Sequence, residues 1–152
     1  MVFQQMNLID SHDIPRLHCH REVFDRNLYK GAVMMQFLLP GMPCIYYGDE
    51  IGMQGYGDPF CRLFFSWDKM DRNLLDYVKK LSEMRKQWRS ILKKGRTEFF
   101  FADHGIVGFW RKSENGKVAF LLNRSDQDFT YIFDNGKVVR LKPWSYEACY
   151  FD

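Results

Sequence analysis

The spacing of apolar residues changes at Gly95, and this change constrains the fold of the 152-residue chain more than any other feature of its sequence. Before Gly95, short apolar runs alternate with longer stretches in which apolar residues recur every three or four positions, as in amphipathic helices. After Gly95, apolar residues recur at every second position, which is typical of strands. The sequence therefore predicts an α/β part over residues 1–94 and an all-β part over residues 95–152.

The α/β part is expected to alternate two strands with two helices. Their predicted positions are a strand at Phe3–Ile9, a helix at Glu22–Leu39, a strand at Pro43–Tyr47 and a helix whose apolar stripe runs from Leu74 to Leu92. Two such β/α units are about a quarter of an eight-stranded β/α barrel. Two units cannot close a barrel, so we expect either a fragment or a chain whose open strand edges are covered by another chain.

The all-β part is expected to hold six short strands with no helix between them. Turn-forming sequences such as Asn135-Gly136 separate them. The predicted strands are Glu98–Ala102, Ile106–Lys112, Lys117–Leu122, Asp128–Phe133, Lys137–Leu141 and Tyr146–Tyr150. Strands of this length and spacing predict a small antiparallel sheet or sandwich, of which we expect the β-sandwich.

Composition excludes several classes of protein. Hydrophobic residues make up 46% of the chain and charged residues 27%, which is enough apolar surface for a packed core and argues against disorder. The longest apolar stretch, Ala32–Pro40, is far shorter than the roughly 20 residues of a membrane span. A net charge of +3 is too small and too scattered to indicate a nucleic-acid partner.

Cysteine and histidine spacing argues against a disulfide framework or a metal site. The four cysteines form no Cys-x-x-Cys pair, so reduced, buried thiols are expected. His18-Cys19-His20 lacks the paired spacings of zinc sites, and we expect satisfied loop residues there. We expect no metal and no cofactor. No basic and apolar leader follows Met1, which predicts a cytoplasmic location.

Ser11-His12-Asp13 carries the chemistry that the sequence suggests most directly. It follows the first predicted strand, and polar residues at the carboxyl ends of β/α-barrel strands line active sites. Asp13 accepts hydrogen bonds and His12 can donate them, so the pair suits the hydroxyls of a sugar ring. Such bonds tighten as the sugar flattens toward an oxocarbenium ion. On spacing alone the favoured interpretation is a turn in which Asp13 caps backbone amides and His12 packs against the protein, because His-Asp is a common dipeptide.

Three segments, taken in order and spacing, resemble the α-amylase family of glycoside hydrolases. Leu8–Arg16 (LIDSHDIPR) resembles the fourth conserved region of that family, and Phe37–Met53 (FLLPGMPCIYYGDEIGM) resembles its last barrel strand. Gly57–Asp68 is similar to the segment that leads into the final barrel helix. The Ser-His-Asp form looks most like the neopullulanase, cyclomaltodextrinase and maltogenic amylase branch, although Asp10 and Ile14 stand where that branch often has Gly and Thr.

The resemblance implies the fold and the activity. It identifies residues 1–94 as the last two β/α units of a TIM-type barrel and residues 95–152 as the family's C-terminal β-domain. The implied activity of the parent protein is retaining hydrolysis of α-1,4 or α-1,6 glucosidic bonds. The family's nucleophilic Asp and acid/base Glu lie on earlier barrel strands, so this chain alone is expected to be inactive.

The resemblance also implies roles for five residues. Asp13 matches the third catalytic carboxylate, which holds the distorted sugar, and His12 matches the histidine that stabilises the same sugar in the transition state. Asp58 and Arg62 match a pair that binds the next glucose unit, with a local salt bridge as the alternative. Arg16 is expected to order the loop by pairing with a carboxylate, with direct substrate contact as the other interpretation.

Asp49 and Glu50 are not expected to be a glycosidase pair, because neighbouring residues on an extended strand point to opposite faces. We expect them to bind backbone amides and basic side chains beneath the site.

The expected partners are an α-glucan or maltooligosaccharide, and either a second copy of the chain or the missing N-terminal part. A non-catalytic oligosaccharide-binding or assembly module is the alternative. The sequence leaves open the linkage preference, the balance between hydrolysis and glycosyl transfer, the calcium dependence and the oligomeric state.

Overall fold

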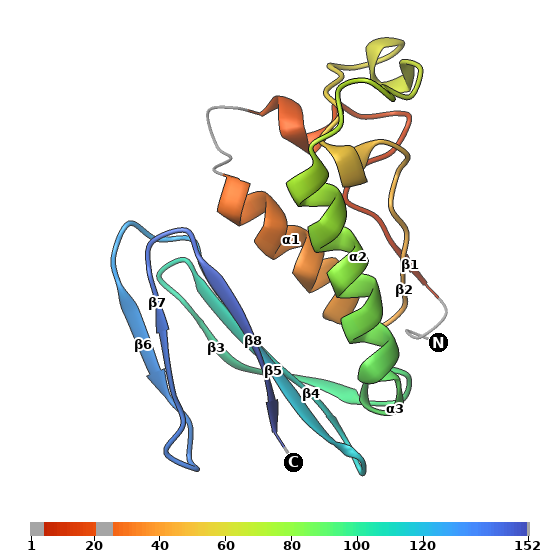
Figure 1. The fold of residues 1–152 in the computed structure, drawn as a ribbon. Coiled ribbons are helices and arrows are strands. Elements are labelled where there is room, and N and C mark those ends of the chain that lie inside the picture. Colours follow the sequence, from red (N-terminus) through yellow and green to blue (C-terminus); the bar gives the residue numbers. More distant parts are fainter. Residues whose placement is uncertain (1–4, 21–25, 152) are drawn as a thin grey trace.

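The computed structural model describes residues 5–20 and 26–151 of the chain (Figure 1). Its helical elements are α1 (Arg26–Leu38), α2 (Arg72–Gln87) and α3 (Arg89–Leu92), with 3₁₀ turns η2 (Leu17–Cys19), η3 (Asp49–Ile51) and η4 (Phe60–Arg62). Its strands are β1 (Met6–Asn7), β2 (Met42–Pro43), β3 (Arg96–Asp103), β4 (Ile106–Ser113), β5 (Gly116–Asn123), β6 (Phe129–Ile132), β7 (Val138–Leu141) and β8 (Tyr146–Phe151). The predicted start of the first helix, Glu22, lies outside these ranges. Within them, none of the helices has the length and apolar character needed to cross a membrane.

The all-β part folds as two antiparallel sheets. Strands β3, β4, β5 and β8 lie side by side in that order, and β6 pairs with β7. All six predicted strands are present, each within two residues of its predicted bounds. Asp103 pairs with Ile106 across a two-residue turn in which His104 and Gly105 both have positive φ, the backbone that tight hairpins require.

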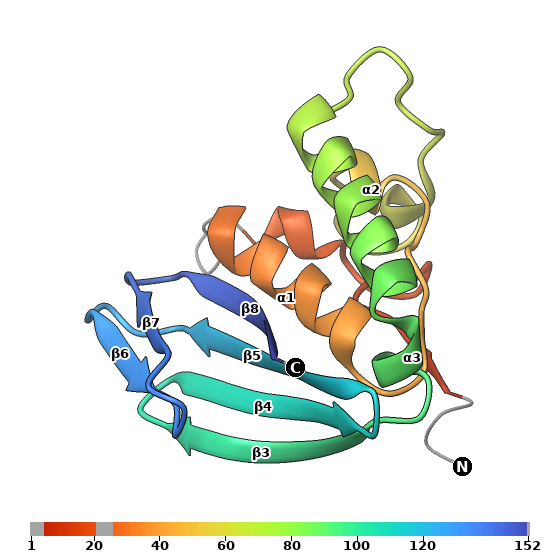
Figure 2. The ribbon, with the colours of Figure 1, turned by 60° about the horizontal axis from the view of Figure 1, so that its bottom comes forward.

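The central strand β5 shows how alternating apolar residues build this architecture. Val118, Phe120 and Leu122 belong to a core cluster with residues of α1 and α3, whereas Ala119 and Leu121 pack with residues of β6 and β7. Figure 2 shows α1 lying across the four-stranded sheet. Because successive side chains of a strand point to opposite faces, one strand contributes to two apolar layers. The helices, the four-stranded sheet and the β6–β7 hairpin therefore form one stack.

The parallel strands β1 and β2 are much shorter than predicted. Only Met6–Asn7 and Met42–Pro43 pair, so the predicted strand lengths at Phe3–Ile9 and Pro43–Tyr47 are wrong within the described residues. Each strand has a described partner on one side only, which leaves few ladder hydrogen bonds to keep the chain extended. Beyond this short ladder the chain enters the loops that carry the candidate site.

The second predicted helix is divided in two. Asp71 caps α2 by accepting a hydrogen bond from the Leu74 amide at 3.1 Å, and the helix ends where Trp88 adopts φ −91° and ψ 16°. The prediction of one uninterrupted stripe to Leu92 is therefore wrong at Trp88. The break lets α3 direct Ile91 and Leu92 into the core cluster beneath the sheet, against which Trp88 itself packs.

A buried arginine joins the helix ends to the sheet. Arg111 on β4 donates hydrogen bonds to the carbonyl of Leu38 at the end of α1, and to those of Leu92 at 2.7 Å and Gly95 at 3.0 Å. The Leu38 and Leu92 carbonyls are among those that helices leave open at their C-terminal ends, and Gly95 lies in the link between α3 and β3. Burial lowers the pKa of the Arg111 guanidinium to about 10, with a smaller contribution from the positive charge of Arg85. Arg111 therefore stays charged at neutral pH while it satisfies these acceptors.

Replacing Arg111 by leucine is expected to lower the free energy of unfolding by about 3 kcal/mol, because buried carbonyls lose their donor. Urea denaturation followed by circular dichroism measures this change. Arg140→Leu, at an exposed position on β7, is the matched control and is expected to have little effect. Equal stability of the two variants would contradict the role given to Arg111.

Candidate functional site

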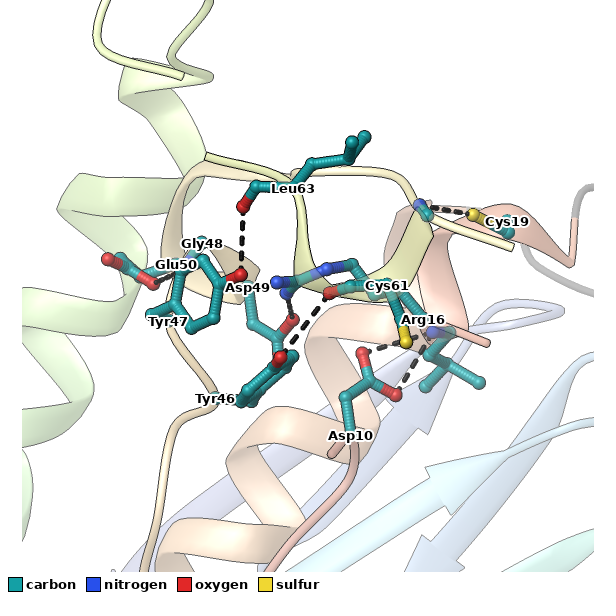
Figure 3. Close-up of polar contacts among 12 residues, drawn as sticks. Asp10, Arg16, Cys19, Tyr46, Tyr47, Gly48, Asp49, Glu50, Cys61 and Leu63 are labelled. Atoms are coloured by element: carbon teal, nitrogen blue, oxygen red, sulfur yellow. Dashed lines mark hydrogen bonds and ion pairs between the residues drawn. The ribbon is translucent and has the colours of Figure 1, made fainter. Parts of the chain in front are cut away.

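The candidate site rests on a buried ion pair between two loops. Arg16 directly precedes η2, and Asp49 opens η3. The Arg16 Nη1 atom lies 2.7 Å from Asp49 Oδ1, and both side chains are buried (Figure 3). Asp10, also buried, accepts hydrogen bonds from the Leu17 amide at 3.0 Å on both carboxylate oxygens. The Arg16–Asp49 contact holds the loop after β1 against the loop after β2, and the Asp10–Leu17 contact orders the first of these loops.

Two tyrosines enclose the rest of the Arg16 guanidinium. Its central carbon lies 4.3 Å from the ring centroid of Tyr46 and 4.9 Å from that of Tyr47. Such cation–π contacts suit a guanidinium removed from water. The Tyr46 hydroxyl donates to the Cys61 carbonyl at 3.3 Å, and the Tyr47 hydroxyl donates to the Leu63 carbonyl at 2.8 Å. The tyrosines therefore connect the buried arginine to the loop that contains η4.

The buried cluster holds two carboxyl groups and one guanidinium. Burial, together with the smaller effect of the nearby charge of Asp10, raises the pKa of Asp49 to about 8, although Arg16 opposes both effects. Burial also raises the pKa of Asp10, against the hydrogen bond from the Leu17 amide. The two carboxyl groups interact and titrate as a pair. At neutral pH the two carboxyl groups therefore share one proton and carry one negative charge. This negative charge balances the positive charge of Arg16.

Above this buried layer, four of the five predicted site residues form one exposed cluster. Asp13 Oδ1 lies 3.1 Å from His12 Nε2 and 3.6 Å from Arg62 Nη2. Arg62 Nε in turn lies 2.7 Å from Asp58 Oδ1. The Asp13 side chain is 67% exposed, so its carboxylate faces solvent. The cluster presents donors and acceptors side by side, which is the arrangement that neighbouring hydroxyls of a sugar require.

Arg16, the fifth predicted site residue, lies beneath the exposed cluster. Its side chain is fully buried, and its carboxylate partner is Asp49. This position favours the loop-ordering interpretation over direct contact with a substrate. Glu50 accepts a hydrogen bond from the Gly48 amide at 2.8 Å. The prediction that Asp49 and Glu50 bind a basic side chain and a backbone amide is therefore confirmed, but the premise that they lie on an extended strand is wrong, because both belong to the 3₁₀ turn η3.

The His18-Cys19-His20 segment makes structural contacts. The Cys19 Sγ atom accepts a hydrogen bond from the Gly55 amide at 2.8 Å, and the His18 ring lies 4.0 Å from that of Tyr29. Among residues 5–20 and 26–151, no group of three or more His, Cys, Asp or Glu side chains is arranged to hold a metal ion.

Sequence reasoning missed the residues that connect the two layers. Tyr46 and Tyr47 belong to a predicted apolar strand and Cys61 is one of four scattered thiols; all three lie in segments that resemble the family, but no role is predicted for any of them. Their contacts join loops distant in the sequence, so no local pattern marks them. Asp10 had one signal, since a carboxylate directly after an apolar strand needs partners when it is buried.

Comparison with known proteins places this site in a family. Residues 2–73 match the model of the family described as alpha amylase, catalytic domain. Over these residues the chain belongs to the α-amylase family. A cyclomaltodextrinase of Geobacillus thermopakistaniensis is 39% identical over 127 residues, which are 80% of this chain and 21% of that enzyme. An intracellular maltogenic amylase of Bacillus subtilis is 33% identical over 138 residues, which are 88% of this chain and 21% of that enzyme.

A solved structure extends the similarity to the fold. The crystal structure of the maltogenic amylase from S. marinus matches 95% of this chain and 22% of its own, with a TM-score of 0.80 and 31% sequence identity. The names of the relatives confirm the branch predicted from Ser11-His12-Asp13. This α-amylase-family chain spans about a fifth of the length of the curated relatives it matches.

The raised pKa of Asp49 predicts a specific pH dependence of stability. A carboxyl group whose pKa is about 8 in the folded state and near 4 in the unfolded state binds its proton more tightly when folded. The free energy of unfolding is therefore expected to fall as pH rises from about 4 through about 8. Urea titrations at several pH values measure this slope. In Asp49→Asn the slope is expected to decrease, because the group no longer titrates.

Asp76→Asn is the matched control for this titration, since Asp76 is exposed on α2. Its pH profile is expected to follow that of the unmodified chain. If Asp49→Asn also leaves the profile unchanged, the buried pair does not hold the proton assigned to it.

Proposed function

We propose that this chain is the C-terminal part of a retaining glycoside hydrolase that acts on α-1,4 or α-1,6 glucosidic bonds. The observation that carries the proposal is the exposed cluster in which Asp13 meets both His12 and Arg62. In this assignment Asp13 and His12 bind the hydroxyls of the sugar whose bond is cleaved. Their hydrogen bonds strengthen as the ring distorts toward the oxocarbenium ion. Family membership and the names of the relatives support an α-glucan as substrate.

Asp58 and Arg62 are assigned to the neighbouring glucose unit. Arg62 contacts Asp58 and Asp13, so it spans the space between the two proposed sugar positions. A guanidinium offers several donors in a fixed plane and suits pairs of hydroxyls. Arg16 supports this arrangement from below through Asp49 and the tyrosines.

The rest of the barrel is proposed to cover the open side of β1 and β2. Met6, Leu8 and Met42 are each more than half exposed on or beside these two strands. Such a face suits burial against further strands of a TIM-type barrel, to which residues 1–94 contribute two β/α units in this proposal. The nucleophilic Asp and the acid/base Glu then come from the remaining part. Residues 95–152 form the C-terminal β-domain.

Asp13→Asn in the longer enzyme is expected to lower kcat on maltohexaose by orders of magnitude, because the amide binds the sugar hydroxyls less strongly than the carboxylate in the transition state. Circular dichroism is expected to stay unchanged, since Asp13 is exposed. The matched control, Asp126→Asn, changes an exposed carboxylate of the β-domain. A near-normal rate for Asp13→Asn would remove it from the catalytic residues.

The 152-residue chain alone is expected to show no turnover of maltooligosaccharides and to self-associate in gel filtration through its open strand face. Mixing it with the N-terminal part of the enzyme is expected to restore hydrolysis. A monomer that binds maltohexaose and gains no activity on mixing would support a non-catalytic binding module instead. Turnover by the chain alone would contradict the proposed division of the active site.

A further inference from the structure

Two hydrogen bonds hold the backbone of the segment Cys61–Leu63, one on each side of the central residue, Arg62. The carbonyl before Arg62, that of Cys61, accepts a hydrogen bond from the Tyr46 hydroxyl at 3.3 Å. The carbonyl after it, that of Leu63, accepts one from the Tyr47 hydroxyl at 2.8 Å. Figure 3 shows both tyrosines reaching this segment from beside Arg16. The backbone on each side of Arg62 is therefore anchored to the buried layer.

A third bond joins the same segment to the loop that carries Asp13. The Cys61 thiol donates to the His12 carbonyl at 3.0 Å, and the Cys61 side chain is fully buried. His12 directly precedes Asp13, so this bond sets the distance between the two loops of the exposed cluster. Arg62 and Asp13 are themselves 3.6 Å apart and exposed, and an exposed ion pair of that length contributes little to holding loops together.

We infer that Tyr47 and Cys61 are positioning residues, which hold Arg62 and the His12-Asp13 loop in the geometry that binds the glucan. This inference rests on the proposed function of the exposed cluster. Tyr47 acts through the backbone at Leu63 on Arg62 alone. Cys61 acts on both loops, because its carbonyl belongs to the Arg62 segment and its thiol binds the His12 carbonyl.

The two residues are therefore expected to affect different kinetic constants. A binding group held in place before the substrate arrives loses less conformational entropy on binding. Tyr47→Phe removes only the hydroxyl, and it is expected to raise KM for maltohexaose about fivefold with little change in kcat. Cys61→Ala is expected to lower kcat as well, because the loop with Asp13 loses its anchor. Cys61→Ser keeps a donor and is expected to recover most of kcat.

A double-mutant cycle in the longer enzyme tests whether Tyr47 acts through Arg62. The variants are Tyr47→Phe, Arg62→Ala and the two combined, with kcat and KM measured on maltohexaose. If Tyr47 positions Arg62, adding Tyr47→Phe to Arg62→Ala is expected to change KM by less than about 1.5-fold. Full additivity of the two effects would overturn the inference for Tyr47.

Matched controls separate positioning from general destabilisation. Tyr150→Phe removes a hydroxyl from an exposed side chain of β8, and Cys149→Ala removes a buried thiol from the core between the sheets. Cys149→Ala is expected to lower the melting temperature without changing KM. If Cys61→Ala behaves like Cys149→Ala, or Cys61→Ser gives no recovery of kcat, Cys61 is a core residue and not a positioning residue.

The outcome also separates this inference from the proposed function. If Asp13→Asn and Arg62→Ala leave turnover unchanged, the proposed function fails. If those two variants lose activity while Tyr47→Phe and Cys61→Ala retain normal kcat and KM, only the inference fails.

A second readout uses the 152-residue chain itself. The NMR signal of Arg62 Nε–H, bonded to Asp58, is expected to exchange with solvent faster in Tyr47→Phe and to be unchanged in Tyr150→Phe.

Discussion

The candidate site depends on one buried guanidinium, that of Arg16, which requires partners inside the protein. Arg16 is fully buried, and a charge removed from water is stable only when its surroundings replace the lost hydration. Asp49 accepts a hydrogen bond from this guanidinium, and the rings of Tyr46 and Tyr47 pack against the group. Each partner comes from the segment after β2. The charge of Arg16 therefore brings the two strand-end loops together.

The exposed cluster follows from this buried layer. The tyrosines that contact Arg16 also donate their hydroxyls to the backbone beside Arg62, and the Cys61 thiol reaches the loop of Asp13. The side chains that face solvent are thus carried on backbone that is fixed from below. This arrangement leaves their donors and acceptors available to a ligand. It is the separation of supporting and binding groups that a preorganised site requires.

The sequence predicted the elements whose neighbours are close in the chain. Alternating apolar residues located all six strands of the all-β part, because adjacent hairpins bury the same faces that the pattern marks. The break at Trp88 was not predicted, since the stripe from Leu74 to Leu92 continues through it. Packing of α3 against the sheet decides that break. The lengths of β1 and β2 depend on their partner strands, which no local pattern describes.

For the site, the sequence by itself determined which chemical groups are available, their order, and the family to which they belong. Ser11-His12-Asp13 and the Asp58–Arg62 spacing identify the residues of the exposed cluster from the sequence alone. Only the tertiary structure decided that Arg16 lies beneath that cluster and that Tyr46, Tyr47 and Cys61 support it. The physical reason is that burial and hydrogen-bond partners are properties of the space between loops. Residues 33 and 49 positions apart make these contacts, and local periodicity carries no information over such separations.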